Sequence, residues 1–589
     1  MNKQSFDVLK IIVEAGYSNQ RIIAEETGYS LGVVNKAIKE LSENEYLDSD
    51  MCITNKAKTC IKNCKPNNAI ILAAGFGMRM VPINMETPKG LLEVRGEVLI
   101  ERTIRQLHEA GIEDISIVVG FMKERYEYLV DEYNVKLIVN TEYSTKNNLY
   151  SVNLIKDKIN NSYIIPCDIW CKNNPYSKYE PYSWYMVSDE VTEFSDVRVN
   201  RKFELVSVDD DEKGNAMLGI SYITSSDSDT LRERITDMCK NDKNINKFWE
   251  EALYKNGSMI VSAKVVNSLD AVEINTYEQL RELDSDSNHL KTEAISIIKD
   301  VLNVDYEDIK NISVLKKGMT NRSFFFECLG KKYIMRIPGE GTEQLINRKE
   351  EADVYKTIKG RGICDNILYI NPETGYKITE YIEGARVCDQ LNPKDVKKCM
   401  KKLKDFHDLN LKVGHRVDIF GLIEFYESLW NGIPSIYKDY EKTKQYVFSL
   451  KEYIEKNKKE EIITHIDANH DNFLIYNDDE GNEEIRLIDW EYAGMQDPDV
   501  DIAMFCIYAM YDREQIDETI SLYYVDGCDE TTRIKIYCYV AACGLLWSNW
   551  CEYKRQLGID FGEYSIRQYR YGKEFYKIVQ EELTKIGEK

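Results

Sequence analysis

A glycine-rich stretch from Ile70 to Lys89 contains residue types that could hold a phosphate group. It starts in the apolar run Ala69–Leu72, which predicts a buried parallel strand, and continues into small residues and glycines. Small residues let a backbone approach a ligand closely, and their N–H groups can surround phosphate oxygens. Arg79 and Lys89 add positive charge, and Pro88 stiffens the segment that presents Lys89. The spacing fits neither the GxGxxG loop nor the Walker loop.

An acidic residue is predicted at the end of another strand in the same region. The run Tyr163–Pro166 is apolar and predicts a strand, and Asp168 follows it closely. Ligands of open α/β sheets bind at the carboxyl ends of the strands. Because carboxylate oxygens are preferred ligands of Mg²⁺, Asp168 is a candidate to connect a metal ion to phosphate oxygens.

A third group of polar residues lies far downstream. Between His465 and Asn472 the sequence has HxDxxxxN spacing, and Asp489 follows inside the apolar run Leu487–Trp490. This is the spacing of the protein-kinase catalytic loop. Asp467 would orient a substrate hydroxyl and accept its proton, while Asn472 and Asp489 would hold Mg²⁺. We expect His465 to brace the loop and not to act as a base.

The elements that must position the first two groups form an α/β domain over residues 66–288. After Lys89 the sequence predicts a helix over Leu99–Ala110 and strands over Ile115–Val119 and Val135–Val139. Strand–helix–strand units at this spacing imply a Rossmann-like, mostly parallel sheet with right-handed crossovers.

Residues 289–589 are predicted to form a bilobal, protein-kinase-like domain around the third group. A turn over Lys316–Asn321 is suited to covering phosphates, and the strand Tyr333–Gly339 supplies Arg336 as a cation. Glu350 on the following helix could pair with Arg336, and Thr379–Gly384 is predicted to be a hinge that offers backbone groups to adenine. The residues expected to contact ATP are Thr320, Asn321, Arg336, Glu350, Glu380 and Ile382.

Residues 1–65 predict a small helical unit with a helix–turn–helix and a short β-wing. It resembles the winged-helix domains of bacterial regulators, in which the third helix would offer Asn35, Lys36 and Lys39 to DNA. These residues include nine Lys or Arg and nine Asp or Glu, a balance that suits phosphates poorly. We therefore expect a docking or dimerising role more than DNA binding.

Length and composition set the broad class. A chain of 589 residues with 43% hydrophobic and 30% charged residues is expected to be a multidomain globular protein. Its 15 cysteines are scattered, and no apolar run approaches the roughly 20 residues that span a bilayer, so a cytoplasmic protein is expected. A net charge of −23 argues against general binding to nucleic acid.

The middle domain resembles nucleotidyltransferases that join a nucleoside triphosphate to a phosphorylated small molecule, and most closely bacterial CTP:phosphocholine cytidylyltransferases. The matching pieces are Leu72–Arg79, Thr87–Gly90, Asn147–Asn148, Asp168, Trp184 and Phe248–Glu250. The resemblance implies CTP binding by Leu72, Ala73, Ala74, Gly75, Gly77, Arg79 and Lys89, with Arg79 and Lys89 also catalytic. It implies that the choline head is held by Trp184, Phe248, Trp249 and Glu250, which agrees with the attraction of quaternary ammonium for aromatic faces.

One position departs from that family. The family's second metal-binding aspartate lies in a Glu-Ile-Asp triplet, whereas this chain has Glu273-Ile274-Asn275. Asn275 can coordinate through its carbonyl, or Glu273 can take its place. Weaker Mg²⁺ binding is the expected consequence.

The C-terminal segment resembles choline and ethanolamine kinases, which share the aminoglycoside-phosphotransferase fold. The resemblance rests on the run from Leu487 to Ala503 and on Arg336 at the usual lysine position. It implies that choline is bound by Glu491, Trp547, Trp550 and Tyr553. Trp547 and Trp550 are three residues apart and would share one face of a helix.

Together the resemblances imply a bifunctional enzyme with Mg²⁺ at both sites and with choline, ATP, CTP and phosphocholine as its small-molecule substrates. It would make phosphocholine and then CDP-choline for surface glycans. Two alternatives remain: the same chemistry on ethanolamine, another amino alcohol or an aminoglycoside, and a winged-helix regulator with sensor-like enzyme domains. A homodimer is compatible with either.

Overall fold

The computed structural model describes residues 2–193, 195–200, 203–208, 212–255, 258–315, 321–339, 345–478 and 480–587. It divides into two compact units, residues 1–296 with 312–314, and residues 297–311 with 315–589. The predicted boundaries at 65/66 and 288/289 remain proposals.

The N-terminal part of the first unit is the predicted winged helix–turn–helix. Its helices are α1 (Lys3–Ala15), α2 (Gln20–Thr27), α3 (Leu31–Glu43) and α4 (Asn55–Asn63). Ser30 begins α3 by accepting a hydrogen bond from the Val33 N–H, and a bridge between Leu47 and Ile53 forms the wing. This part contacts the following domain, since the Glu180 N–H donates to the Cys64 carbonyl at 2.7 Å and Lys10 donates to Ser177.

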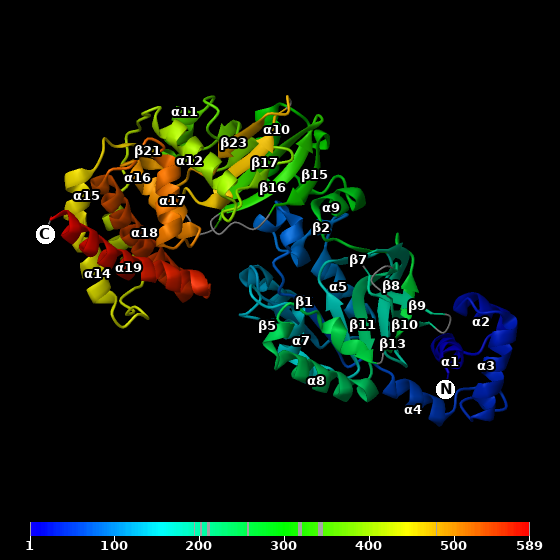
Figure 1. The fold of residues 1–589 in the computed structure, drawn as a ribbon. Coiled ribbons are helices and arrows are strands. Elements are labelled where there is room, and N and C mark those ends of the chain that lie inside the picture. Colours follow the sequence, from blue (N-terminus) through cyan, green and yellow to red (C-terminus); the bar gives the residue numbers. More distant parts are fainter. Residues whose placement is uncertain are drawn as a thin grey trace. The chain divides into compact units, whose positions relative to one another are not determined.

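A ten-stranded sheet organises the rest of the first unit (Figure 1). Its strands in spatial order are β5 (Lys136–Val139), β4 (Ile115–Val119), β1 (Asn68–Ala73), β6 (Ser162–Pro166), β11 (Gly214–Ile223), β8 (Trp184–Thr192), β13 (Ser258–Val266), β10 (Glu204–Ser207) and β9 (Val197–Val199), with β12 (Tyr254–Lys255) beside β13. The β5–β4–β1–β6 half is parallel, as predicted, because its connections cross over the sheet. Beyond β6 the sheet is mixed, since β11 is antiparallel to both of its neighbours.

Helices cover both faces of this sheet. On one face α5 (Leu99–Glu109) packs Ile104 against Ala69 and Ile71 of β1. On the other, α7 (Asn148–Ile155) and α8 (Ser225–Cys239) form a second core with Ile70. The remaining elements are the pairs β2 (Glu93–Val94) with β3 (Glu97–Val98) and β7 (Ile169–Cys171) with β14 (Ala271–Glu273), and the helices α6 (Tyr128–Tyr133) and α9 (Tyr277–Leu283).

The second unit has the two lobes predicted for a kinase-like domain. Helix α10 (Glu293–Leu302) precedes a five-stranded sheet in the order β15 (Ile309–Val314), β16 (Asn321–Cys328), β17 (Lys331–Pro338), β19 (Lys377–Glu380), β18 (Ile367–Ile370), with α11 (Arg348–Ile358) between β17 and β18 in the chain. The other lobe contains the strands β20 (Arg386–Val387), β21 (Ile462–Thr464), β22 (Phe473–Asn477), β23 (Glu483–Leu487) and β24 (Gly494–Gln496), and the helices α12 (Pro393–His407), α13 (Ile419–Ser428), α14 (Tyr440–Ser449), α15 (Lys451–Asn457), α16 (Asp499–Tyr508), α17 (Arg513–Tyr523), α18 (Glu530–Gln556) and α19 (Glu563–Ile586).

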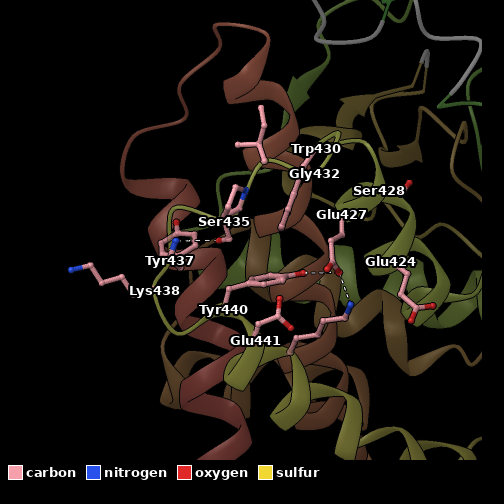
Figure 2. A pocket seen from close by; sticks show the side chains of 13 residues that line it. Glu424, Glu427, Ser428, Trp430, Gly432, Ser435, Tyr437, Lys438, Tyr440 and Glu441 are labelled. Atoms are coloured by element: carbon pink, nitrogen blue, oxygen red, sulfur yellow. Dashed lines mark hydrogen bonds and ion pairs between the residues drawn. The ribbon is translucent and has the colours of Figure 1, made fainter.

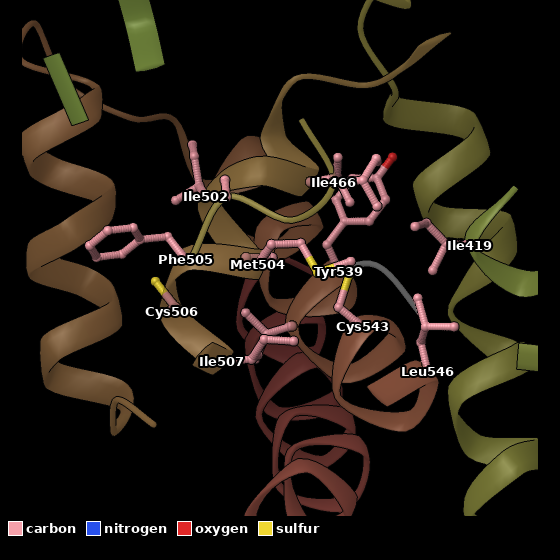
Figure 3. Close-up of a cluster of buried hydrophobic side chains, with 14 of the residues drawn as sticks. Ile419, Ile466, Ile502, Met504, Phe505, Cys506, Ile507, Tyr539, Cys543 and Leu546 are labelled. Atoms are coloured by element: carbon pink, nitrogen blue, oxygen red, sulfur yellow. The ribbon is translucent and has the colours of Figure 1, made fainter. Parts of the chain in front are cut away.

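Helix α18 is the centre of the helical lobe. It is apolar around most of its circumference, as expected for a helix surrounded by others, and packs on α13, α16 and α19. Ile466, next to the predicted catalytic Asp467, belongs to the same core as Met504 and Cys543 (Figure 3). The predicted catalytic loop is therefore anchored directly in the core of the lobe.

Candidate active sites

The structure brings together the cations and oxygen ligands predicted from the glycine-rich stretch. Because β1 and β6 are parallel with Leu72 opposite Pro166, their following loops meet at one edge of the sheet. There Lys89 Nζ donates to Asp168 Oδ2 at 2.9 Å and to Asn275 Oδ1 at 2.7 Å. Arg79 Nη2 also donates to Asn275 Oδ1, at 3.0 Å.

Gly77 allows Lys89 to lie against the loop. Its φ of +66° is in the left-handed region, and a Cβ atom there would lie 2.9 Å from the Cγ atom of Lys89. A Cβ on Gly75 would meet no atom within 4 Å. The loop therefore holds the lysine tightly at one glycine and leaves open space at the other.

Strand β14 delivers Glu273 and Asn275 to this edge. The Ile274 N–H donates to the Asp168 carbonyl at 2.9 Å, which fixes the two segments together. Burial raises the pKa of Glu273, and the negative charge of Asp168 raises it further. Oxygen atoms of these side chains fit the ligand preference of Mg²⁺, so Asp168 with Glu273 or Asn275 would hold the ion, which would supply charge stabilisation to reacting phosphates.

Few protein ligands are available at either predicted metal position. Across the part of the chain that the structure describes, no three His, Cys, Asp or Glu side chains gather as a metal site.

Glu250 and Tyr185 extend the middle site, whereas Trp184 lies elsewhere. The Tyr185 hydroxyl donates to Glu250 Oε1 at 3.3 Å, and burial raises the pKa of Glu250 to about 7. Across the sheet, Trp184 of β8 pairs with Tyr222 of β11, which pairs with Tyr163 near the amino end of β6. Asp168 follows the opposite, carboxyl end of β6, so Trp184 is away from it. Its indole donates to Glu180 Oε2 at 2.9 Å inside the core, so the structure does not bring it to the site.

The other two predicted aromatic residues differ in exposure. Trp249 is buried in the core next to Tyr185, whereas Phe248 is 54% exposed. The sequence did not single out two aromatic residues here, Phe76 within the glycine-rich loop and Phe121, whose ring centroids lie 4.3 Å apart. Phe76 is inside the motif itself, so its position was a usable signal.

The predicted kinase loop is held in one conformation by several hydrogen bonds. Asn472 Nδ2 donates to the Asp467 carbonyl at 2.9 Å and to Asp467 Oδ2 at 3.0 Å. The His465 and Ile466 N–H groups each donate to Asp501 at 2.8 Å. Burial lowers the pKa of His465 to about 4, so its ring is neutral and links the loop to the Ile488 carbonyl.

We expect phosphorylation by the second unit to rise with pH across neutrality. Burial raises the pKa of Asp467 to about 7, and a hydrogen bond from the Tyr508 hydroxyl opposes that rise. Because the proton acceptor must be ionised, activity should fall about tenfold per pH unit well below that pKa. ADP release measured over a pH series checks this, and Tyr508→Phe should move the profile to higher pH. A profile that is flat, or that moves to lower pH, contradicts this role for Asp467.

Arg336 has a buried carboxylate partner, which is Glu351 and not the predicted Glu350. Arg336 forms two hydrogen bonds with Glu351, one of them at 3.0 Å. Asn347 caps α11, and successive residues of a helix point about 100° apart. The prediction was therefore one residue out, and Glu351 is the residue that faces the sheet.

Glu351 and its neighbour Glu350 provide a matched pair of variants. We expect Glu351→Gln to lower kcat/KM for ATP by at least about tenfold, because it leaves the Arg336 guanidinium buried without a counter-charge. Glu350→Gln, on the same helix, should leave it unchanged. ADP release at varied ATP checks both, and equal effects would contradict the assignment.

The other predicted ATP contacts are placed as follows. Asn321 donates to Glu491 Oε2 at 2.7 Å and accepts from Arg348 at 3.0 Å, so Glu491 belongs to an ion-pair cluster with Arg348. Glu380 accepts from Asn366 at 2.6 Å at the end of β19, and the Ile382 carbonyl accepts from the Ala385 N–H. Thr320, with the rest of the predicted turn before Asn321, lies outside the described residues.

The predicted tryptophan pair forms part of a larger aromatic group near Asp467. Trp547 and Trp550 on α18 are buried, with ring centroids 5.5 Å apart. Tyr508, whose hydroxyl lowers the pKa of Asp467, packs on Trp547 with ring centroids 5.3 Å apart. The group also includes Tyr492, Phe561 and Tyr564. Sequence spacing could not reveal these, because the segments that carry them meet α18 only in the fold.

A separate pocket of about 730 Å³ lies between the end of α13 and the start of α14 (Figure 2). Trp430 and Tyr440 line it, and both bond Asn549 of α18, which lies between the two tryptophans. None of the predicted site residues lines this pocket.

Comparisons with known proteins define the class. The family description "Choline/ethanolamine kinase" matches residues 312–541, "MobA-like NTP transferase domain" matches residues 69–172, and "Winged helix-turn-helix DNA-binding" matches residues 1–48. The chain therefore combines a kinase-like domain, a nucleotidyltransferase domain and a winged helix–turn–helix, as predicted.

Individual relatives narrow the class. Choline-phosphate cytidylyltransferase of Streptococcus pneumoniae is 30% identical over 230 residues, 37% of this chain and 96% of that protein. A 2-aminoethylphosphonate cytidylyltransferase of Lancefieldella rimae is 34% identical over 244 residues, 38% of this chain and 92% of that protein. Protein LicA of Haemophilus influenzae is 25% identical over 268 residues, 42% of this chain and 96% of that protein. The chain belongs to the family of choline-phosphate cytidylyltransferases through its middle domain, and it carries a choline kinase-like domain as well.

Proposed function

We propose that this protein converts choline to CDP-choline in two steps at two separate sites. The kinase-like domain transfers the γ-phosphate of ATP to the hydroxyl of choline, with Asp467 accepting the proton. The middle domain then lets the phosphate oxygen of phosphocholine attack the α-phosphorus of CTP, and pyrophosphate leaves. The observation that supports this most is the presence of two complete polar groups, Lys89–Asp168–Asn275 and Asp467–Asn472–Asp489, in one chain.

The kinase-like domain favours a phosphate ester as the intermediate. One relative is named for 2-aminoethylphosphonate, a compound with a carbon–phosphorus bond. A kinase transfers phosphorus to oxygen and cannot make that bond. A chain that carries both domains is therefore better suited to phosphocholine or to another phosphorylated amino alcohol.

The aromatic group near Asp467 favours a quaternary ammonium. A primary ammonium donates hydrogen bonds and prefers carboxylates, whereas trimethylammonium has no N–H and is attracted to π-faces. Trp547, Trp550 and Tyr508 supply such faces close to the catalytic carboxylate. This supports choline over ethanolamine.

Removal of one tryptophan tests that preference. Trp547→Ala should raise the KM for choline roughly thirtyfold, since a desolvated cation–π contact is worth about 2 kcal/mol. The KM for ATP should be unchanged, and Trp547→Phe, which keeps a π-face, should lose less. Initial rates at varied choline check this, with thermal unfolding as a control for folding. An equal rise in the KM for ATP would contradict a role of Trp547 in choline recognition.

We further propose a cytoplasmic location, where ATP and CTP are made and where thiols stay reduced. No helix of the described residues is long and apolar enough to cross a membrane. Phosphocholine on surface glycans is the proposed end use. The winged-helix part has its third helix exposed at Asn35, Lys36 and Lys39, but its balanced charge supports docking or dimerisation more than DNA binding.

Product analysis tests the whole proposal. The protein incubated with choline, ATP, CTP and Mg²⁺ should yield phosphocholine, ADP, CDP-choline and pyrophosphate by mass spectrometry. Ethanolamine added in equal amount should be consumed more slowly. Preferred consumption of ethanolamine, or release of neither ADP nor pyrophosphate, would overturn the proposal.

A further inference from the structure

Two arginines of the ATP-binding lobe have buried carboxylate partners. Arg336 is engaged by Glu351 and by the Gly375 carbonyl. Arg348 lies 2.9 Å from Glu351 and 3.2 Å from Glu491. Both guanidinium groups are therefore neutralised by buried carboxylates.

Lys377 is a buried cation outside these pairs. It lies opposite Arg336 where β19 pairs with β17, and it is only 6% exposed. Its Nζ donates to the Tyr355 hydroxyl at 2.6 Å, and no carboxylate of the described residues lies within ion-pair distance of it. A buried cation whose neighbours are the hydroxyl and the ring of one tyrosine is costly unless another charge compensates it.

Asp489, like Asp365 with its buried Oδ1, is a carboxylate without a partner among the described residues. It has a left-handed backbone with φ of +66°, and its carboxylate forms no hydrogen bond or ion pair with the described residues. The next residue, Trp490, donates its backbone N–H to the same Tyr355 hydroxyl at 3.4 Å. Among the cations around the Asp489 carboxylate, Lys377 exerts the largest electrostatic effect and Arg336 the next.

We propose that Lys377 is a positioning residue that holds Asp489 ready for the magnesium ion of the nucleotide. The Tyr355 hydroxyl connects the Lys377 ammonium to the backbone beside Asp489, and the lysine charge balances the carboxylate. Tyr355 and Glu351 lie one turn apart on α11, so the same helix orients Arg336 and the Asp489 segment. This inference rests on the proposed kinase activity of the second unit.

Nucleotide binding with and without metal tests this role separately from catalysis. Calorimetry on the full chain would give the Kd of ADP in EDTA and in excess Mg²⁺. Lys377→Met should weaken Mg²⁺·ADP by about tenfold or more, as is typical when a group that supports a metal ligand is lost, and should leave metal-free ADP unchanged. Lys331→Met, an exposed lysine on β17, is the matched control and should change neither value.

Two outcomes for Lys377→Met would overturn the inference. An equal loss for ADP with and without Mg²⁺ would make Lys377 a nucleotide contact or a purely structural residue, and no change in either would give it no role. If Lys377→Met does not unfold cooperatively, Tyr355→Phe, which removes only the hydroxyl, should show a smaller loss confined to Mg²⁺·ADP. No change there overturns the inference too. Failure of the proposed kinase function is distinguishable, because the unaltered protein would then fail to bind Mg²⁺·ADP or to phosphorylate choline.

Discussion

Asp467→Asn is expected to lower choline-dependent ADP release by about 10²–10⁴-fold, the usual contribution of general acid–base catalysis. The asparagine keeps the shape of the side chain and can still meet the Asn472 amide, but it cannot accept the proton of the substrate hydroxyl. Pyrophosphate release from CTP and phosphocholine should persist at the unaltered rate. Two coupled assays on one preparation, one for ADP and one for pyrophosphate, measure both outcomes.

Asp471→Asn is the matched control for this substitution. Asp471 lies in the same loop but is exposed, with its Oδ1 atom 3.9 Å from His470 Nε2. We expect it to retain both activities. Loss of both activities in a folded Asp467→Asn protein would show that the sites are not independent and would refute the two-site proposal.

Asp168→Ala should produce the opposite pattern. It removes the carboxylate that Lys89 contacts at 2.9 Å and that would hold the metal ion. Because metal-ion stabilisation of transferring phosphates is worth several kcal/mol, pyrophosphate release should fall by at least about a hundredfold. ADP release with choline should be unchanged.

Asp131→Ala supplies a surface carboxylate control in the same domain, since Asp131 is exposed on α6. Restoration of pyrophosphate release in Asp168→Ala by Mn²⁺ would strengthen the metal assignment. An Asp168→Ala protein that keeps most of its pyrophosphate release would remove Asp168 from the proposed mechanism.

Contiguous motifs were predictable because their geometry is local. The glycine-rich loop and Asp168 follow two neighbouring parallel strands, and parallel register alone brings their ends together. The kinase loop likewise carries Asp467 and Asn472 within one turn of chain, so their hydrogen bond follows from the spacing.

Orientation around an element was harder to predict. Trp184 and Tyr185 are adjacent on β8, where successive side chains face opposite sides, and only Tyr185 reaches Glu250. The prediction of Glu350 in place of Glu351 was wrong for a similar reason, because successive residues of a helix point in different directions. Contacts such as Lys89 with Asn275, or Tyr508 with Trp547, depend on tertiary packing that no local pattern specifies.

The attachment of the winged-helix part has a practical consequence. Its contacts through Cys64, Glu180 and Ser177 reach the core beside Tyr163 and Trp184, near the amino end of β6, whereas Lys89 and Asp168 lie at the carboxyl end. The predicted active site and the attachment of the winged-helix part therefore lie at opposite ends of the strands. A tether, a fluorescent reporter or an immobilising support placed on the winged-helix part would be attached at the end of the sheet away from Lys89 and Asp168. That makes it the natural handle for single-molecule or surface-bound work on this enzyme.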